Sequence, residues 1–112
     1  MANNKLYKGS LTTIILKLLD QGGKMYGYEI TQKVKVITKG ELKITEGALY
    51  PALHKLEADG MLDVEVEKVD NRLRKYYKLT EKGSKETNSK LQELQDYIKT
   101  MQLLVNPKFN FD

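Results

Sequence analysis

The chain has 112 residues, of which 40% are hydrophobic and 30% are charged, and it contains no cysteine. These numbers predict one domain with a modest core, and they exclude disulfides and thiolate metal sites. No apolar run is long enough to cross a membrane, and Met1–Ser10 has no apolar signal core, so we expect a cytoplasmic protein. The net charge of +4 is compatible with a polyanionic partner but does not require one.

Two amphipathic helices are predicted in the first third of the chain, over Lys8–Asp20 and Tyr26–Thr38. Glycines follow each segment and are expected to end it. Between the second helix and the next one, Lys43–Ile44 is expected to form a very short strand. The apolar stripes consist of Leu11, Ile14, Ile15, Leu18 and Leu19 in the first helix and of Tyr26, Ile30, Val34 and Ile37 in the second.

A third helix is predicted to begin after Thr45, whose hydroxyl suits the N-cap position, and to end at Gly60. Its apolar residues Leu49, Ala52, Leu53 and Leu56 share one face. Pro51 cannot donate the backbone hydrogen bond of a helix interior. Either the helix begins late, with Pro51 in its first turn, or it bends at that residue.

A β-hairpin and a long helix complete the predicted elements. Met61–Lys68 alternates apolar and charged residues, as a half-buried strand does, and Arg74–Leu79 is expected to be its partner. Asp70-Asn71 is a turn signal between the two strands. Thr80 is a second N-cap, for a helix that runs to about Val105 before Asn106-Pro107.

The predicted fold class is mainly α with a small β-hairpin. The order of elements is helix, helix, short strand, helix, strand, strand, helix, which is that of a winged helix-turn-helix with one added C-terminal helix. We expect residues 1–80 to form the winged-helix region and residues 81–105 to form a dimerisation helix of the same domain. Residues 106–112 are expected to be a flexible tail.

The outward face of the third predicted helix is a candidate for contact with a DNA major groove. It carries Gly47, Tyr50, Pro51 and His54, with Lys55 on the flank, and side chains of these types reach base edges and phosphates. A solvated helix surface with an incidental tyrosine is an equally good interpretation of this face alone. His54 is not expected to be a catalytic base or a metal ligand, because it is the single histidine and has no suitably spaced partners.

The hairpin tip strengthens the DNA interpretation. From residue 68 to residue 78 there are five basic residues against one acid. Asn71 and Arg72 suit a minor groove, Arg74 and Lys75 suit phosphates, and Lys43 extends the footprint ahead of the third helix. The alternative is a charged strand edge that prevents aggregation.

The last predicted helix carries a heptad seam, which requires another helix to pack against it. Its later members are Leu91, Leu94, Ile98, Met101 and Val105. The first helix can cover part of this seam, and we expect a second copy of the chain to cover the rest. A homodimer would present two copies of the third helix to a pseudo-palindromic double-stranded site, roughly 34 Å apart. The alternative is that the last helix packs only on its own domain.

The chain resembles the PadR-like family of transcriptional regulators, in the small subgroup with a single C-terminal helix. The resemblance covers about Leu11 to Leu91, and its motifs occur in the family's order and spacing. These motifs are Tyr26-Gly27-Tyr28-Glu29-Ile30, Thr45-Glu46-Gly47-Ala48-Leu49-Tyr50-Pro51-Ala52-Leu53, Leu56-Glu57-Ala58-Asp59-Gly60, and Arg74-Lys75-Tyr76-Tyr77-Lys78-Leu79-Thr80 followed by Gly83.

The resemblance implies a transcriptional repressor that is released from DNA by a small molecule. It adds Tyr26, Gly27 and Thr45 to the expected DNA-binding residues. Some small members of the family bind flat aromatic drugs between subunits with a tryptophan of the last helix. This chain has no tryptophan, and Leu94 takes that place, faced by Leu6, Gly9 and Thr13. The resemblance thus leaves a small hydrophobic effector, or none, as the alternatives.

Two other function classes compete with a DNA-binding repressor. One is a winged helix that contacts proteins, since the fold hosts both uses, and the other is a small-molecule-binding protein without direct DNA regulation. An enzyme is not expected, because the chain has no Gly-rich phosphate loop, metal cluster or nucleophile–base set. No cofactor and no metal are predicted.

Overall fold

A computed structural model describes residues 6–106 of the chain. The described part is mainly helical with one small antiparallel sheet, so the predicted fold class is confirmed. The elements in chain order are η1 (Lys8–Ser10), α1 (Leu11–Gly22), β1 (Met25–Tyr26), α2 (Gly27–Ile37), α3 (Glu46–Ala58), β2 (Leu62–Val69), β3 (Arg72–Leu79) and α4 (Glu81–Val105).

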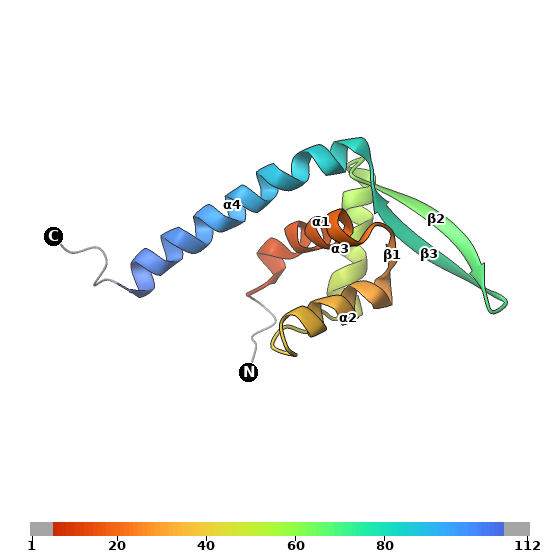
Figure 1. The fold of residues 1–112 in the computed structure, drawn as a ribbon, viewed down its shortest axis with the longest axis horizontal. Helices are drawn as coiled ribbons and strands as arrows, with labels where there is room; N and C mark the ends of the chain where they lie inside the picture. The colour runs from red at the N-terminus through yellow and green to blue at the C-terminus, as the bar shows by residue number, and fades with distance from the viewer. Residues whose placement is uncertain (1–5, 107–112) are drawn as a thin grey trace.

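The three short helices and the base of the hairpin surround one core, and two elements extend beyond it (Figure 1). The β2–β3 hairpin, here called the wing, projects at one end, and the C-terminal half of α4 projects at the other. At the centre, α1 packs against α3, α4 and β3. Its side chains Ile15 and Leu16 are fully buried, as are Ile30 of α2, Leu49 and Leu53 of α3, and Leu62 and Tyr77 of the sheet.

The short strand lies elsewhere than predicted. Lys43–Ile44 forms no strand, although Ile44 is buried in the core. Instead Met25–Tyr26 forms β1, which pairs antiparallel with Tyr76 and Tyr77 of β3, so that the strand order is β1-β3-β2. The prediction was wrong because Tyr26 was assigned to the helix that follows it. Tyr26 is the N-cap residue of that helix and a strand residue at once.

The start of the second wing strand also differs from the prediction. The hairpin turn is tight, since Val69 pairs with Arg72 and only Asp70 and Asn71 lie between the strands. Both turn residues have positive φ, 49° and 64°, as a two-residue hairpin turn requires. Arg72 therefore belongs to β3, two residues before the predicted start at Arg74.

Both predicted N-caps are confirmed. The Thr45 hydroxyl accepts a hydrogen bond from the Ala48 amide at 3.2 Å, and the Thr80 hydroxyl accepts one from the Gly83 amide at 3.0 Å. Because α3 begins at Glu46, Pro51 lies inside the helix, and the alternative of a late helix start is wrong. Within residues 6–106, no helix has the length and hydropathy needed to cross a membrane. Of the predicted flexible tail, residues 107–112 lie outside the described part of the chain.

Candidate nucleic-acid interface

Helix α3 separates into a buried face and an exposed face, as its apolar stripe predicts. Leu49, Leu53 and Leu56 are buried in the core. The predicted contact residues Gly47, Pro51, His54 and Lys55 are exposed, and so is the N-cap Thr45. The start of α3 thus presents free backbone amides and an uncrowded polar surface, the combination that accepts a phosphate and reaches base edges.

Tyr50 differs from its exposed neighbours because it is half-buried between two helices. A Cβ atom added to Gly27 would lie 2.4 Å from the Tyr50 hydroxyl oxygen, so the first residue of α2 must be a glycine to admit this ring. The Tyr50 ring also lies 6.4 Å from the His54 ring, centroid to centroid. Tyr50 therefore fixes the start of α2 against α3, a packing role that the helical wheel did not reveal.

Gly47, unlike Gly27, has open space beside it. A Cβ atom added there would meet nothing within 4 Å. The protein itself therefore gives no steric reason for a glycine at this exposed helical position. The space beside Gly47 is open to a molecule that approaches α3 from solvent.

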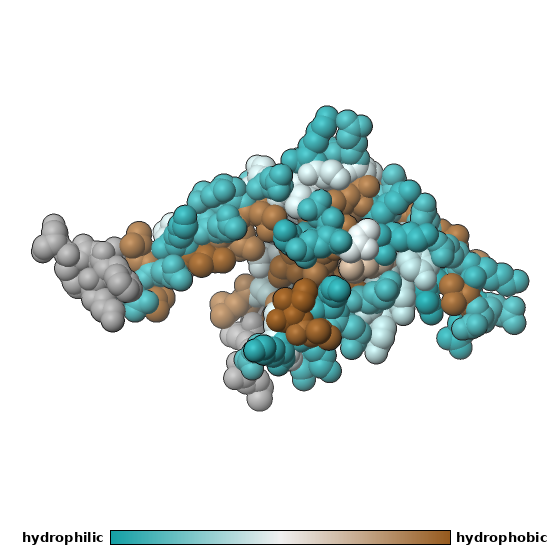
Figure 2. Space-filling model, in the orientation of Figure 1, coloured by the Kyte–Doolittle hydropathy of each residue, from teal (hydrophilic) through white to brown (hydrophobic). Residues whose placement is uncertain are grey.

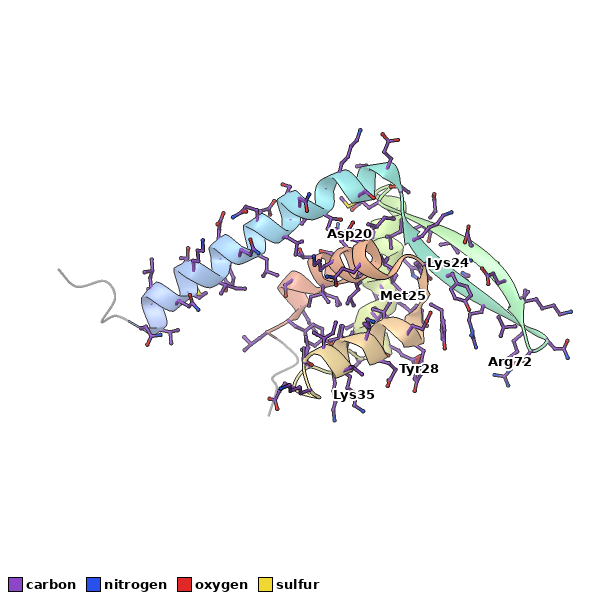
Figure 3. All side chains as sticks on the ribbon, in the orientation of Figure 1. Asp20, Lys24, Met25, Tyr28, Lys35 and Arg72 are labelled. Carbon is purple, nitrogen blue, oxygen red and sulfur yellow. The ribbon has the colours of Figure 1, made fainter. Side chains whose placement is uncertain are left out.

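The tip of the wing carries cations without acidic partners. Asn71, Arg72 and Lys75 are exposed, as is Lys68. None of these basic residues forms an ion pair with another residue in the described range. In Figure 3 the Arg72 side chain extends from the tip into solvent. Such a tip is suited to a polyanion.

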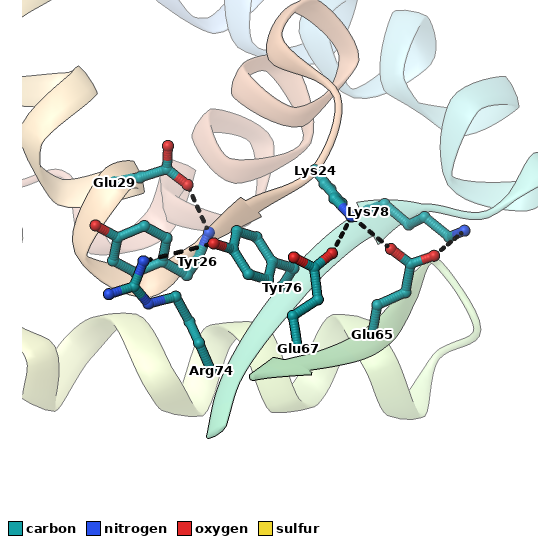
Figure 4. Close-up of polar contacts among 8 residues, drawn as sticks. All are labelled: Lys24, Tyr26, Glu29, Glu65, Glu67, Arg74, Tyr76 and Lys78. Carbon is teal, nitrogen blue, oxygen red and sulfur yellow. Dashed lines mark hydrogen bonds and ion pairs between the residues drawn. The ribbon is translucent and has the colours of Figure 1, made fainter. Parts of the chain in front are cut away.

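Arg74 is placed differently from the cations at the tip. Its guanidinium carbon lies 4.1 Å from the centroid of the Tyr26 ring, and it donates a hydrogen bond to the Tyr76 hydroxyl at 3.5 Å (Figure 4). Two residues that were predicted to contact DNA, Tyr26 and Arg74, thus contact each other. Lys43, by contrast, is exposed in the loop before α3.

Sequence reasoning missed the contacts at the base of the wing. Lys24 bridges Glu65 and Glu67 of β2, and Tyr76 lies edge-on to Tyr26. The alternation of the two wing strands places Glu65, Glu67, Arg74 and Lys78 on one face. No sequence signal links Lys24 to residues more than 40 positions later.

The four residues predicted to line a ligand cavity lie around one surface pocket of about 370 Å³. Leu6, Gly9 and Thr13 come from the N-terminal segment and α1, and Leu94 comes from α4. Tyr97, one turn after Leu94, supplies an aromatic side chain to the same pocket. Elsewhere in residues 6–106, no group of three or more histidines and acids is placed to hold a metal ion.

Known proteins share this arrangement. Residues 15–89 match the transcriptional regulator PadR-like family. A transcriptional regulator from Clostridium thermocellum is 31% identical, with a TM-score of 0.83 over 91% of this chain and 99% of that chain. A PadR-like transcriptional regulator from Bacillus cereus is 26% identical, with a TM-score of 0.73 over 91% and 97% of the two chains. The transcriptional regulator Rv3488 of Mycobacterium tuberculosis is 38% identical over 60 residues, which are 54% of this chain and 53% of that relative.

The family match runs from within α1 through α2, α3 and the wing to the start of α4. The relatives named above are transcriptional regulators rather than enzymes. The chain therefore belongs to the PadR-like family of transcriptional regulators.

Proposed function

We propose that the protein is a homodimeric, sequence-specific repressor that binds a pseudo-palindromic DNA operator and is released by a small-molecule effector. The observation that carries this proposal is the pairing of an exposed polar face on α3 with a wing tip of unneutralised cations. A helix of this kind enters a major groove, while a basic hairpin holds the neighbouring backbone.

In the proposed complex the residues divide into two groups. His54 and Pro51 of α3 meet base edges and methyl groups, and they select the sequence. Arg72 and Lys75 of the wing, together with the free amides at the start of α3, meet phosphates and fix the register. The first group determines which site is bound, and the second supplies most of the salt-dependent affinity.

Shift assays at several salt concentrations test this division. Arg72→Ala should weaken binding to every duplex and reduce the slope of log affinity against log salt by about one. His54→Ala should instead reduce the preference for one sequence over others. Lys85→Ala removes the same charge from the exposed surface of α4 and is the matched control for Arg72→Ala. Equal effects of Arg72→Ala and Lys85→Ala would contradict the proposed wing contact.

Dimerisation is supported by the uncovered apolar surface of α4. The helix has 25 residues, and within it only Gly83 and Thr87 are buried. Ile98 is 48% exposed and Val105 is 75% exposed. Figure 2 shows the apolar side chains along the lower edge of the projecting helix. Apolar residues that continue a heptad seam into solvent are explained by a second helix that packs on them.

A charge within the seam tests the dimer. Ile98→Asp should give a monomer in sedimentation or light scattering. Thr100→Asp places the same charge two residues away, off the seam, and should leave the dimer intact. A wild-type protein that remains monomeric at micromolar concentration would overturn this part of the proposal.

Effector release is supported by the pocket between α1 and α4, which lies beside the seam proposed for dimerisation. Its lining combines Leu6, Leu94 and Tyr97 with Lys90 and Glu93, so it suits a small, mainly apolar molecule with one polar group. A ligand there would change the angle between the subunits, and with it the spacing of the two α3 helices.

Coupling between two binding sites is reciprocal. Bound DNA should therefore lower the affinity for the effector by the same factor as the effector lowers the affinity for DNA. Half-site separation, measured with and without ligand, tests the geometric mechanism, and an unchanged separation would remove it. Tight ligand binding with no change in DNA affinity would favour a ligand-binding protein instead. Salt-insensitive binding to a protein partner, without retention on duplex DNA, would favour a protein-interaction module.

A further inference from the structure

The outer face of the three-stranded sheet carries a continuous set of polar contacts that reaches from β1 across the whole base of the wing (Figure 4). The register places Tyr26 opposite Tyr76, and Tyr76 opposite Glu65. Arg74 and Glu67 form the next pair toward the wing tip. These side chains point away from the core and lie beside one another on one face.

The ionic half of this set joins the segment before α2 to β2. The Lys24 amine contacts the Glu65 carboxylate at 3.3 Å and also contacts Glu67. Lys78 contacts the other oxygen of Glu65 at 2.9 Å. Hydrogen bonds with Glu67, and then with Glu65, raise the pKa of Lys24, while hydrogen bonds from Lys78 and Lys24 lower the pKa of Glu65. Two lysines thus neutralise two glutamates on this face.

The aromatic half joins the same strand to the first residues of α2. The Arg74 guanidinium covers the Tyr26 ring and donates to the Tyr76 hydroxyl, and the two rings meet edge-on with centroids 5.6 Å apart. Tyr26 is the N-cap residue of α2, and its backbone amide donates to the Glu29 carboxylate at 3.1 Å. A cation that stacks on a tyrosine ring in this way is attracted to the ring face.

The distal half of the wing has no such support. Val66 is 55% exposed and Leu73 is 77% exposed, although both lie on the strand face that packs against the core nearer the base. A two-stranded ribbon by itself is marginally stable in water. The angle at which the wing leaves the domain therefore depends on the contacts at its base.

We propose that Lys24, Glu65 and Glu67, together with the Tyr26–Arg74–Tyr76 stack, form a brace that holds the wing at a fixed angle to α2 and α3. We call this set the wing brace. Its members are positioning residues, and Lys24 in particular holds the glutamates of the wing rather than a phosphate. The inference rests on the proposed DNA-binding function and adds to it the residues that set the wing angle.

The direction in which one substitution changes DNA affinity distinguishes a brace from simple electrostatic repulsion. Removing an acid from a DNA-binding domain reduces its repulsion for phosphates and ordinarily strengthens binding. Glu67 of the brace should behave in the opposite way, because without its carboxylate Lys24 keeps only Glu65 as an acidic partner and the wing loses its angle. Asp63 is the matched control, since it lies on the same strand and the same face but has no hydrogen bond or ion pair within residues 6–106.

The experiment uses the full chain and a duplex that the wild-type protein has selected from a random-sequence pool. Glu67→Gln should bind this duplex about twofold to fivefold more weakly, the scale of losing one exposed ion pair. Asp63→Asn should bind it as tightly as the wild type or more tightly. Lys24→Met should lose affinity without a change in salt slope, and Lys24→Arg should restore it. Tighter binding by Glu67→Gln, or a slope that falls by about one in Lys24→Met, would overturn the brace.

A measurement without DNA separates the brace from the proposed function. Amide hydrogen exchange reports local opening, and Glu67→Gln should speed exchange in β2 and β3 while α1 and α3 keep their wild-type rates. Unchanged exchange in the wing would refute the brace, whatever the DNA result. If the wild-type protein bound no duplex, the proposed function would fail, and the exchange rates would decide the brace alone.

Discussion

Replacing Gly47 with alanine tests the proposed DNA contact through a change that should stabilise the free protein. Gly47 is the second residue of α3, is exposed and has an ordinary helical backbone, and an added Cβ meets nothing within 4 Å. Alanine stabilises a helix relative to glycine by about 0.5–1 kcal/mol. We expect a gain near the lower value, because the position is close to the helix end.

The same methyl group should interfere with the operator. If a sugar-phosphate backbone approaches the start of α3, the Cβ displaces it and at least one amide–phosphate hydrogen bond is lost. Hydrogen bonds to a charged group contribute about 1.5–3 kcal/mol. This corresponds to roughly a tenfold to hundredfold loss of affinity.

Both effects can be measured on one preparation. Thermal unfolding should show a melting temperature raised by about 2–4 °C, taking about 4–8 °C per kcal/mol for a domain near this size. Fluorescence anisotropy with a labelled operator should show weaker binding. A variant that is more stable and binds the operator as tightly as the wild type would refute the proposed approach of DNA to α3.

Three further outcomes follow from the geometry. Gly83→Ala should destabilise the fold by about 1–3 kcal/mol, because the new Cβ would lie 2.2 Å from the backbone oxygen of Met61, which cannot move aside; an unchanged melting temperature would contradict this. In Gly27→Ala the new Cβ meets the end of the Tyr50 side chain instead. We therefore expect a smaller loss of stability than in Gly83→Ala, together with weaker operator binding. A larger loss of stability in Gly27→Ala than in Gly83→Ala would contradict this packing. Hydrogen bonds from Lys78 and Lys24 lower the pKa of Glu65 from 4.5, so its contribution to wing protection is present above pH 4.5 and is lost as the pH falls through the lowered pKa. Amide protection factors measured against pH should show this loss in the wing, and Glu65→Gln should reduce the dependence.

Local rules in the sequence were sufficient for most helices and for the hairpin. The stripe of Leu49, Leu53 and Leu56 predicted the buried face of α3, because a period of 3.6 residues brings these side chains to one side. Thr45 and Thr80 marked two helix starts, because each hydroxyl reaches an amide three residues away. These rules involve neighbours in the chain, so they can be read without the fold.

Contacts between distant segments needed the tertiary structure. Strand β1 has two residues, too few to show a period, and it exists because Tyr76 and Tyr77 of β3 lie beside it. The half-buried position of Tyr50 depends on Gly27, which another helix brings to its ring. A helical wheel of α3 contains no information about Gly27, which belongs to another helix.

The sequence by itself determined the helices, the hairpin and the number of cations on the wing, although it misplaced the short strand. Only the tertiary structure decided which cations remain available, because Lys24 and Arg74 find their partners on strands that are far away in sequence. The physical reason is that charge and helical periodicity are properties of the chain. The pairing of a charge, and the angle of a wing that depends on it, exist only after the sheet has formed.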